Sequence, residues 1–579
     1  MTDTRRQYPF YAWRFWFLGG VLLLGFVALM ARAAYLQTIN TSFLQQQSDS
    51  RALRDLPITS YRGTITDRHG EELAVSIEVE SVFLDPKEII EKHDPEGMRK
   101  GKAWNQLAVV LFGKKPHELN KLVDANASRQ FVWAKRQLAP EEAELVRMLN
   151  LPGVHLVREF RRYYPHGEIS AHVVGFTDID ERGIEGIERA FDKELTAAHG
   201  AERKIMDRRR RVVEDHGVIK KAQPGQDITL AIDSRIQTIA YQELKKSVRE
   251  HRARSGSIVI LDVLTGEVLA MVNQPSYNPN KRQDRPLGAT RNRAITDTFE
   301  PGSTAKPITV VSALESGLYK PKSIIDTRPG YMRVGGSWVR DDGHNYGVLD
   351  LAGVIRKSSN VGVAQMALAM PKEHFLGTFQ RLGFGVPINT GFPGESPGRL
   401  ILEKRWSKFE LATVSYGYGF TTTPLQLARA YATLAGGGIQ KPVSFLKVRD
   451  GVVGQQVLDE QIAKSVLNMM EEVTTDGTGK LAQVQGYRVS GKTGTIRKAT
   501  AGGYSSDYQA VFAGVAPVKN PRLVMVAMID EPAGDRYYGG NVAAPVFSVV
   551  MDQALRLINV TPDGEAQKFV QTGREANDV

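Results

Sequence analysis

Three short motifs with chemically active side chains follow one another along the chain, at residues 303–306 (STAK), 358–360 (SSN) and 492–495 (KTGT). A serine hydroxyl is a weak nucleophile at neutral pH and needs a base within hydrogen-bond reach. Taken singly, each motif is more typical of a helix cap, a surface lysine or a loop. In this order, together, they indicate an acyl-transfer site with a serine nucleophile and a lysine base.

The first motif supplies the nucleophile and the base. Residues three apart on a helix share a face, so Ser303 and Lys306 are expected side by side. Pro307 is tolerated only in or beside the first turn, which predicts that the helix begins near Ser303. Backbone N–H groups at that positive helix end can hold a developing oxyanion. Lys306 acts as a base only if its pKa falls, and Lys492 is the candidate cation nearby.

The second motif is predicted to form a turn between two helices. One helix follows Asp350, and the apolar segment 361–370 forms the other. Ser358 and Asn360, two residues apart on a tight turn, can point into one cleft. Ser358 is then placed to relay a proton between Lys306 and a leaving amine. Asn360 is expected to orient Lys306 and a substrate amide, and to cap the second helix.

The third motif is predicted to lie on a strand over residues 487–495. Alternation along a strand puts Thr493 and Thr495 on one side, where both can bind a carboxylate or an amide. Gly494 leaves room for a peptide to approach the backbone closely. An extended substrate can then pair with this edge as an added strand, while Lys492 gives the cleft positive charge.

The S-x-x-K, S-x-N and K-T-G set is typical of penicillin-binding proteins. The chain resembles the monofunctional class B members of that family, the DD-transpeptidases that cross-link peptidoglycan, over nearly its whole length. Residues 62–70 (RGTITDRHG) and 183–188 (GIEGIE) are similar to elements of the family's pedestal domain. Residues 299–303 (FEPGS) and 415–419 (SYGYG) look more like the septal, cell-division branch than the elongation branch.

This resemblance implies a reaction and a set of site residues. Ser303 would attack the carbonyl between two D-alanines of a stem peptide, with the N–H groups of Ser303 and Thr495 as the oxyanion hole. The acyl-enzyme would pass to the amine of a neighbouring stem peptide, and β-lactams would acylate Ser303 as covalent inhibitors. No metal or other cofactor is expected. The expected catalytic set is Ser303, Lys306, Ser358, Asn360 and Lys492. The expected substrate-binding set is Thr493, Gly494, Thr495, Arg497, Tyr416, Tyr418, Tyr538 and Gly539.

Composition agrees with an enzyme of the cell envelope. The chain has 579 residues, enough for two or three folded units, and a formal net charge of +11. It has no cysteine, which excludes a disulfide scaffold, a thiol nucleophile and a cysteine-based zinc site. Without a nucleic-acid-binding motif, the positive charge favours anionic wall polymer and phospholipid as partners, and no nucleic acid is expected.

The N-terminal segment predicts a membrane anchor. Residues 15–36 are apolar apart from Arg32 and are long enough to span a bilayer. Arg5, Arg6 and Arg14 precede the segment and favour an N-terminus in the cytoplasm. Residues 31–33 (ARA) resemble a cleavage site, so a cleaved signal peptide is the alternative. We favour a single-pass anchor in the inner membrane, with the catalytic domain in the periplasm, and the resemblance implies a place at the division septum.

The predicted fold class is a multi-domain α+β protein. It comprises an N-terminal transmembrane helix, an elongated pedestal domain and a β-lactamase-like transpeptidase domain. In that last domain, a five-stranded antiparallel sheet with helices on both faces is expected from strands at 257–263, 267–272, 487–495, 507–516 and 522–530, with a helix at 544–557. The expected division is a cytoplasmic tail at 1–14, the anchor at 15–36, a linker at 37–55, the pedestal at 56–225, the transpeptidase domain at 226–560 and a polar tail at 561–579.

Basic clusters at 161–165 (RRYYP) and 208–211 (RRRR) are interpreted as solvated faces, with wall or partner binding as the alternative. The resemblance also implies partners: lipid-linked or polymerised stem peptides, a SEDS-type glycosyltransferase and other division membrane proteins. A β-lactamase is disfavoured because no E-x-x-L-N element stands between the second and third motifs. A DD-carboxypeptidase, an elongation-type transpeptidase, a β-lactam sensor and a non-catalytic divisome scaffold remain open alternatives.

Overall fold

The computed structural model describes residues 12–41, 53–93, 97–113, 116–206, 212–283, 285–286, 288–403, 405–449, 451–500, 503–534 and 536–564. Within it the chain divides into two compact units. Unit 1 combines residues 1–60 with 197–224, and unit 2 combines residues 61–196 with 225–579. The basic cluster at 208–211 and most of the predicted linker and tails lie outside the described residues.

Unit 1 contains the predicted anchor. Helix α1 (Ala12–Thr38) has 27 residues, and none of its side chains is buried. It is long and apolar enough to cross a membrane, since an α-helix of that length spans about 40 Å. The helix therefore includes the predicted segment 15–36 and exceeds it at both ends. Unit 1 also holds a three-stranded antiparallel sheet in the order β1 (Leu53–Ile58), β8 (Gly200–Met206) and β9 (Val212–Lys220).

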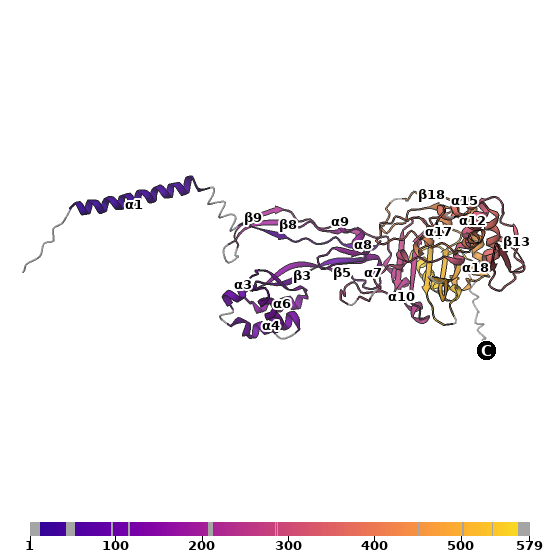
Figure 1. The fold of residues 1–579 in the computed structure, drawn as a ribbon, viewed down its shortest axis with the longest axis horizontal. Coiled ribbons are helices and arrows are strands. Elements are labelled where there is room, and N and C mark those ends of the chain that lie inside the picture. Colours follow the sequence, from indigo (N-terminus) through magenta and orange to yellow (C-terminus); the bar gives the residue numbers. More distant parts are fainter. Residues whose placement is uncertain are drawn as a thin grey trace, which may run out of the picture. The chain divides into compact units, whose positions relative to one another are not determined.

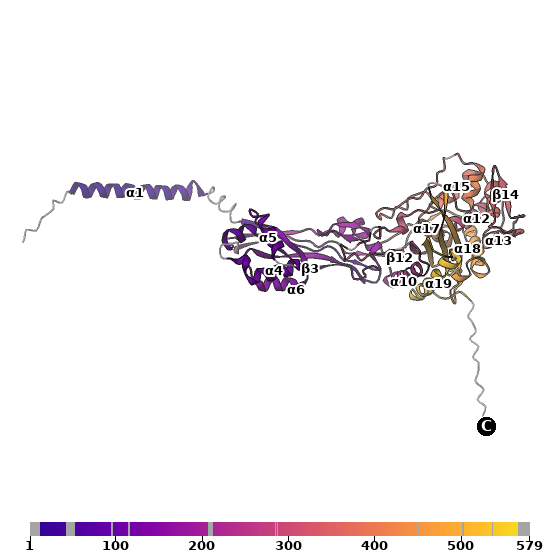
Figure 2. The ribbon, with the colours of Figure 1, turned by 60° about the horizontal axis from the view of Figure 1, so that its bottom comes forward.

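The N-terminal part of unit 2 is built on two long antiparallel strands, β3 (Glu72–Leu84) and β5 (Val154–Tyr163), which run side by side (Figure 1). Strands β2 (Ile65–Thr66), β4 (Val132–Leu138) and β10 (Ile228–Thr229) complete this sheet. Helices α4 (Lys102–Phe112), α5 (His117–Asp124) and α6 (Pro140–Leu149) gather at one end of β3 (Figure 2). Trp104 is fully buried in the small hydrophobic core that they share with the strands.

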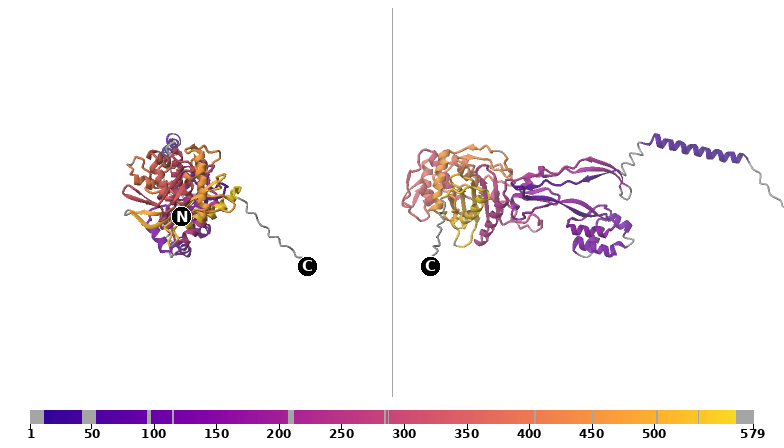
Figure 3. Two further views of the ribbon diagram at one scale, coloured as in Figure 1. Left: turned by 90° about the vertical axis from the view of Figure 1, so that its right-hand side faces the viewer. Right: turned by 180° about the vertical axis from the view of Figure 1, so that it is seen from behind.

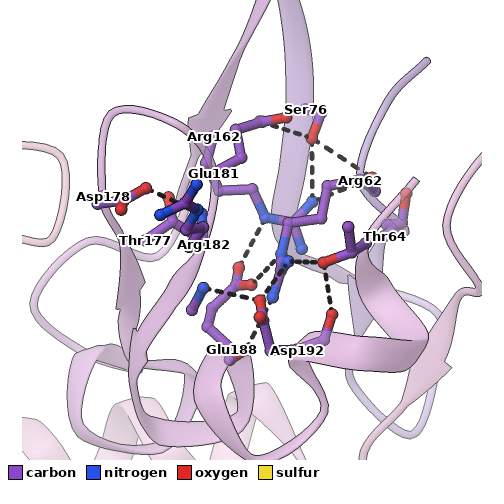
Figure 4. A network of polar contacts seen from close by, with 12 residues as sticks. Arg62, Thr64, Ser76, Arg162, Thr177, Asp178, Glu181, Arg182, Glu188 and Asp192 are labelled. Atoms are coloured by element: carbon purple, nitrogen blue, oxygen red, sulfur yellow. Dashed lines mark hydrogen bonds and ion pairs between the residues drawn. The ribbon is translucent and has the colours of Figure 1, made fainter. Parts of the chain in front are cut away.

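An ion-pair network lies at the other end of these strands (Figure 4). The carboxylate of Glu188 accepts hydrogen bonds from Nε of Arg62 and from Nε of Arg162, each at 2.6 Å. Nη1 of Arg62 also donates to Asp192 at 2.7 Å. Arg162 is only 2% exposed, so the interpretation of residues 161–165 as a solvated face is wrong for this side chain. A buried arginine needs a paired carboxylate, and the GIEGIE element provides it.

The C-terminal part of unit 2 contains the predicted five-stranded antiparallel sheet, in the order β12-β11-β21-β20-β19. Figure 3 shows the orange to yellow strands of this sheet within that part of the chain. Strand β19 begins three residues later than predicted and runs further, because its far end pairs with β20 in a long hairpin. The strands are β11 (Ser255–Asp262), β12 (Val268–Gln274), β19 (Ser490–Thr500), β20 (Gly503–Ala516) and β21 (Leu523–Asp530).

Both faces of this sheet are covered, as predicted. Val259 and Leu261 of β11 belong to one hydrophobic core, and the alternating Ile258 and Ile260 belong to a second. Helix α17 (Pro424–Ala435) packs on the first face. Helices α10 (Ser234–Glu250) and α19 (Gly539–Leu557) pack on the other. Strands buried on both sides read as continuous apolar runs, which is why they could be located from the sequence.

The remaining elements complete unit 2. Those in its N-terminal part are α3 (Pro86–Glu88), η1 (Ile89–His93), η2 (Met98–Lys100), α7 (Ala171–Val174), β6 (Phe176–Thr177), β7 (Gly183–Glu185), α8 (Gly186–Ala190) and α9 (Asp192–Leu195). Those in its C-terminal part are α11 (Arg293–Thr296), η3 (Gly302–Ala305), α12 (Lys306–Glu315), β13 (Ile324–Asp326), β14 (Tyr331–Val334), β15 (Ser337–Arg340), β16 (Val348–Asp350), α13 (Leu351–Lys357), α14 (Asn360–Ala369), α15 (Lys372–Arg381), α16 (Lys408–Ser415), β17 (Ile439–Gln440), β18 (Gln455–Gln456), α18 (Glu460–Thr475) and η4 (Lys480–Ala482).

Candidate active site

The first motif forms the tight helical entry predicted from Pro307. Ser303 lies in the 3₁₀ turn η3, and Lys306 is the first residue of the α-helix α12 that continues it. The turn is fixed from outside, because the N–H of Gly302 donates to the carbonyl of Gly417 at 2.9 Å. A Cβ on Gly417 would stand 2.0 Å from the carbonyl oxygen of Gly302, so this contact requires glycine. The 415–419 element therefore braces the turn that carries Ser303.

Ser358 joins the three motifs through its hydroxyl. Its Oγ donates to Oγ of Ser303 at 3.1 Å, and it accepts from Nζ of Lys306 and Nζ of Lys492, both at 3.0 Å. Nζ of Lys306 also donates to the carbonyl of Ser358. Among the described residues, no direct hydrogen bond joins Ser303 to Lys306. The two side chains predicted to be partners are thus connected through Ser358.

The backbone of Ser358 adopts the left-handed conformation, with φ of 58°. This conformation is uncommon for residues other than glycine and costs on the order of 1–3 kcal/mol at strained sites. It ends helix α13 and turns the chain into α14 two residues later. The strained turn is what aims the hydroxyl of Ser358 at both lysines.

Both lysines are buried, with exposed fractions of 1% for Lys306 and 0% for Lys492. Burial lowers the pKa of Lys306 well below its usual range, and the positive charge of Lys492 lowers it further. Burial likewise lowers the pKa of Lys492, to about 7. A low-dielectric site disfavours the charged form of an amine. The lowered pKa favours the neutral form of Lys306, which is the form that a base needs.

The structure corrects the predicted role of Asn360 as a helix cap. The Oγ of Ser359 caps α14 by accepting from the N–H of Gly362 at 2.9 Å, and Asn360 is the first residue inside the helix. Nδ2 of Asn360 donates to the carbonyl of Arg340 at 2.8 Å, and the structure gives it no hydrogen bond to Lys306. Asn360 does face the same cavity as Ser303.

Asp341 holds this turn in place and was missed from the sequence. Its carboxylate accepts from Oγ of Ser359 at 2.7 Å and from the N–H of Val361 at 2.9 Å. The pairing joins residues about twenty positions apart, so no local pattern could have revealed it. The strained conformation of Ser358 is thereby anchored by a buried carboxylate directly beside it.

The third motif lies on β19, which is the edge strand of the sheet, as the strand-addition hypothesis requires. Thr493 and Thr495 both face the cavity. Gly494 faces the protein instead, because a Cβ there would meet the side chain of Thr304 at 3.1 Å. Its space is filled by the turn of Ser303 rather than left open for substrate. Gly539 is also structural, since its N–H donates to Oγ1 of Thr495 at 3.0 Å.

A cavity of about 900 Å³ opens onto these groups. Nine of the predicted residues line it: Ser303, Lys306, Ser358, Asn360, Thr493, Thr495, Arg497, Tyr418 and Tyr538. Lys492 reaches the site through its bond to Ser358. Tyr416, Gly494 and Gly539 are not among the residues that line the cavity; Tyr416 packs in the apolar core and contacts the ring of Tyr418 at 5.9 Å between centroids.

Aromatic rings build one wall. Tyr508 stacks on Tyr537 at 4.3 Å between centroids, and Tyr537 stacks on Tyr538 at 4.6 Å. Nε of Arg497 donates to the hydroxyl of Tyr508 at 3.3 Å. Sequence reasoning named Arg497 and Tyr538 but missed Tyr508 and Tyr537. It also missed other lining residues, namely Arg340, Asp342, Gly343, Tyr346, Lys357, Thr478 and Asn541. They come from loops and from the ends of β15, α13 and α19, whose approach to one another depends on tertiary packing.

Comparison with known proteins agrees with this geometry. The model of the penicillin binding protein transpeptidase domain matches residues 256–552, and that of the penicillin-binding protein dimerisation domain matches residues 57–230. The chain is 44% identical over 567 residues to the peptidoglycan D,D-transpeptidase FtsI of Escherichia coli K12, covering 97% of this chain and 95% of that one. It is 40% identical over 541 residues to the probable peptidoglycan D,D-transpeptidase PenA of Neisseria meningitidis serogroup B, covering 93% and 91%.

Solved structures give the same picture. The transpeptidase domain of Burkholderia pseudomallei penicillin-binding protein 3 is similar with a TM-score of 0.54 and 40% identity, covering 58% of this chain and 98% of that one. A peptidoglycan synthetase from Bifidobacterium adolescentis is similar over 89% of this chain and 98% of its own, with a TM-score of 0.69 and 25% identity. On its sequence, its two domain matches and its fold, the chain belongs to the FtsI-like peptidoglycan D,D-transpeptidases of the penicillin-binding protein family.

Proposed function

We propose that this D,D-transpeptidase works through an acyl-enzyme on Ser303, with Lys306 as the base and Ser358 as the proton relay. The observation that carries the proposal is the set of three hydrogen bonds at Oγ of Ser358, which connects the candidate nucleophile to two buried lysines. Hydroxyl hydrogens rotate, so at the same oxygen and nitrogen positions Ser358 can also accept from Ser303 and donate to neutral Lys306, which is the direction the proton must take. The residue roles below rest on that geometry.

In the acylation step, Oγ of Ser303 attacks the carbonyl carbon between the two D-alanines of a donor stem peptide. The serine proton moves through Ser358 to neutral Lys306. The backbone N–H groups of Ser303 and Thr495 stabilise the oxyanion. The C–N bond then breaks, and the leaving D-alanine takes a proton back through Ser358. An ester between Ser303 and the shortened peptide remains.

In the second step, the amine of a neighbouring stem peptide attacks the ester carbonyl, and the C–O bond to Ser303 breaks. The amine loses a proton to the same relay, which returns one to Ser303.

Lys492, Thr493 and Thr495 are the proposed carboxylate-binding groups, and Arg497, Tyr418 and Tyr538 are the proposed walls of the binding cleft. The cavity volume of about 900 Å³ supports a reaction in which donor and acceptor peptides bind side by side. A β-lactam would acylate Ser303 by the first step alone.

Intact-protein mass spectrometry tests the nucleophile. The full chain in detergent is incubated with benzylpenicillin beside a Ser303→Ala variant. A stable adduct of one penicillin, absent from the variant, supports the proposal. Rapid loss of the drug without an adduct would favour hydrolysis, as in a carboxypeptidase-like or β-lactamase-like enzyme. An adduct in both proteins would move the nucleophile elsewhere.

We further propose that α1 is a single-pass anchor with its N-terminus in the cytoplasm and the rest of the chain in the periplasm at the division septum. The arginines before the helix support this orientation. Because the chain has no cysteine, single cysteines report topology without background. In spheroplasts, a membrane-impermeant maleimide should label Lys220→Cys, and should label Thr4→Cys only after lysis. The reverse pattern would overturn the orientation.

The domain division at residues 1–14, 15–36, 37–55, 56–225, 226–560 and 561–579 also stands as a proposal, as does a SEDS-type glycosyltransferase partner. Support for the partner comes from the family alone. Cross-linking by the purified chain should therefore rise when such a glycosyltransferase is reconstituted with it in one membrane. Equal cross-linking with and without it would count against the partnership.

A further inference from the structure

A second polar cavity, of about 480 Å³, lies outside the active site in unit 2. Its walls come from β4, β5 and β6 and from the loop at residues 279–283, which follows β12. The side chain of Asn280 already ties that loop to β5, because its Oδ1 accepts from the N–H of Tyr164 at 3.0 Å and its Nδ2 donates to the carbonyl of Tyr164 at 2.9 Å. The cavity thus lies between β5 and this loop, next to the point where Asn280 joins them.

The lining of this cavity is strongly basic. Five of its residues are cationic, and none of its described lining residues carries a carboxylate: Arg136, Arg161, Arg162, Lys281 and Arg282 are the cations. Arg136 is neutralised, since its guanidinium pairs with Glu159 at 2.7 Å and with Asp180 at 2.7 Å. Arg162 pairs with Glu188 in the buried network. The other three cations have no such partner among the described residues.

These three cations come from two segments of the lining. Arg161 is on β5, and Lys281 and Arg282 are on the loop. Arg282 donates only to neutral oxygens, Oε1 of Gln137 at 2.9 Å and the carbonyl of Asp178 at 3.1 Å. Burial lowers the pKa of Arg282 and the charge of Arg161 lowers it further, while Tyr164, Asp178 and Glu181 nearby offset part of this effect without forming an ion pair. An arrangement of unpaired, mutually repelling cations is stabilised when an anion enters.

Two buried polar groups of the lining also have no partner. Nη2 of Arg162 and Oγ1 of Thr177 make no hydrogen bond to any described residue, and both side chains are about 2% exposed. Figure 4 shows Arg162 and Thr177 on neighbouring segments of this region. Buried donors without a partner are rare in folded proteins and cost about 1–3 kcal/mol each. Their place in a basic cavity is a second observation that points to a ligand.

We propose that this cavity binds an acidic segment of a partner protein, with the carboxylates of that segment paired to Arg161, Lys281 and Arg282. Carboxylates are the partners that arginines already take on this surface, as Arg136 shows with Glu159 and Asp180. The three cations come from two separate segments of the lining, β5 and the loop, and acidic side chains along one extended segment can pair with them together. Arginine clusters commonly recognise acidic motifs in this way.

Occupancy would have a structural consequence. A segment that pairs with Arg161 on one side and with Lys281 and Arg282 on the other bridges the long strands of the N-terminal part to the loop at 279–283. That loop leads through α11 to the turn of Ser303. Binding would then add to the contacts that Asn280 and Arg282 already make between the two parts of unit 2.

Fluorescence anisotropy of a labelled hexaglutamate peptide on the full chain in detergent tests the proposal. Arg161→Glu and Lys281→Glu are the informative variants, because neither side chain forms an ion pair or a hydrogen bond with another described residue. Each should weaken binding about tenfold or more, since a bond to a charged group is replaced by repulsion. Arg249→Glu, an exposed arginine on α10, is the matched control and should bind as the unchanged chain does.

Three outcomes would overturn the proposal. The first is equal binding by the two cavity variants and the Arg249→Glu control. The second is displacement of the peptide by inorganic phosphate when the concentration of phosphate equals that of the peptide's carboxylates. That result would mean that the cavity binds phosphate groups in preference to carboxylates. The third is equal affinity for hexaglutamine. The rate of acylation by benzylpenicillin should be unchanged in both cavity variants, which shows that the fold and the distant active site are intact.

Discussion

The hydroxyl oxygens of Ser303 and Ser358 lie 3.1 Å apart, and Ser358 is the only described residue that hydrogen-bonds the nucleophile to the lysines. A serine in the left-handed conformation, braced by Asp341 beside it, thus stands between Ser303 and Lys306. The geometry makes Ser358 a relay and makes Lys306 an indirect base. Each consequence below can be measured on the purified chain.

Ser358→Ala should slow acylation of Ser303 by benzylpenicillin about 10²–10⁴-fold, the usual contribution of a positioned proton-transfer group. The substitution removes the hydroxyl that links Ser303 to both lysines, while Ser303 itself remains. Stopped-flow acylation kinetics measure the effect. Ser316→Ala at the end of α12 is the control and should acylate normally, because its hydroxyl bonds only local backbone, donating to the carbonyl of Ala313 and accepting from the N–H of Leu318. A rate within threefold of the unchanged chain would mean that Lys306 reaches Ser303 without a relay.

The pH dependence of acylation should report Lys306. A base works only when neutral, so the rate should fall on the acid side as Lys306 takes up a proton. Burial and the charge of Lys492 keep the pKa of Lys306 well below its usual range, so the acid limb should lie at lower pH than it would for an ordinary lysine. Lys492→Gln removes one of these two causes. It should therefore raise the pKa of Lys306 and move the acid limb of the rate profile to higher pH.

Lys492→Arg is the matched control for this prediction, because it keeps a positive charge beside Lys306. Its acid limb should stay close to that of the unchanged chain. The comparison uses the pH at which the acylation rate falls and not the maximal rate, because Lys492 is also a proposed carboxylate-binding group. An acid limb at the same pH in the Gln variant would show that Lys492 does not set the pKa of Lys306.

The sequence predicted the features that depend on local chemistry. The three motifs located Ser303, Lys306, Ser358 and Lys492, because residue type and spacing alone identify such groups. The strands of the main sheet were found because their apolar runs are continuous. The cap of α14 was assigned to Asn360 rather than Ser359, since both residue types cap helices well and the pattern cannot separate neighbours.

Features that depend on distant contacts were not predicted. Asp341 acquires its role only when its loop meets the turn of Ser358. Gly494 was assigned to substrate, yet the turn of Ser303 occupies the space above it. Arg162 belongs to a basic run that looks solvated, and it is buried because Glu188 lies opposite it in the fold. In each case the deciding partner is far away in the sequence.

Gly539→Ala should damage the active site without touching a catalytic side chain. A Cβ at this position would stand 2.3 Å from the carbonyl oxygen of Gly494 and 2.5 Å from that of Val511, both rigid backbone atoms of the sheet. Either β19 or the start of α19 must shift, at a cost of about 1–3 kcal/mol or more. We expect a lower thermal transition and slower acylation.

Gly336→Ala is the control for this substitution. Nothing lies within 4 Å of a Cβ at that hairpin position, and its backbone conformation is one that alanine adopts. Both the thermal transition and the acylation rate should stay unchanged there. If Gly539→Ala behaved like Gly336→Ala, the packing of α19 against β19 would be looser than the distances indicate.

The buried network of the N-terminal part makes a separate prediction about stability. Glu188→Gln removes the carboxylate that pairs with both Arg62 and Arg162, and both arginines stay buried. Breaking a buried ion pair in this way lowers the free energy of unfolding by about 3–5 kcal/mol. Glu78→Gln breaks the exposed pair with Arg158 and should cost about 1 kcal/mol or less. Limited proteolysis and thermal unfolding of the full chain compare the two. Only Glu188→Gln should open residues 61–196 to protease.

Because the network lies apart from the active site, the Glu188→Gln variant should still form the penicillin adduct at low temperature. Loss of the adduct at low temperature would tie the network directly to catalysis.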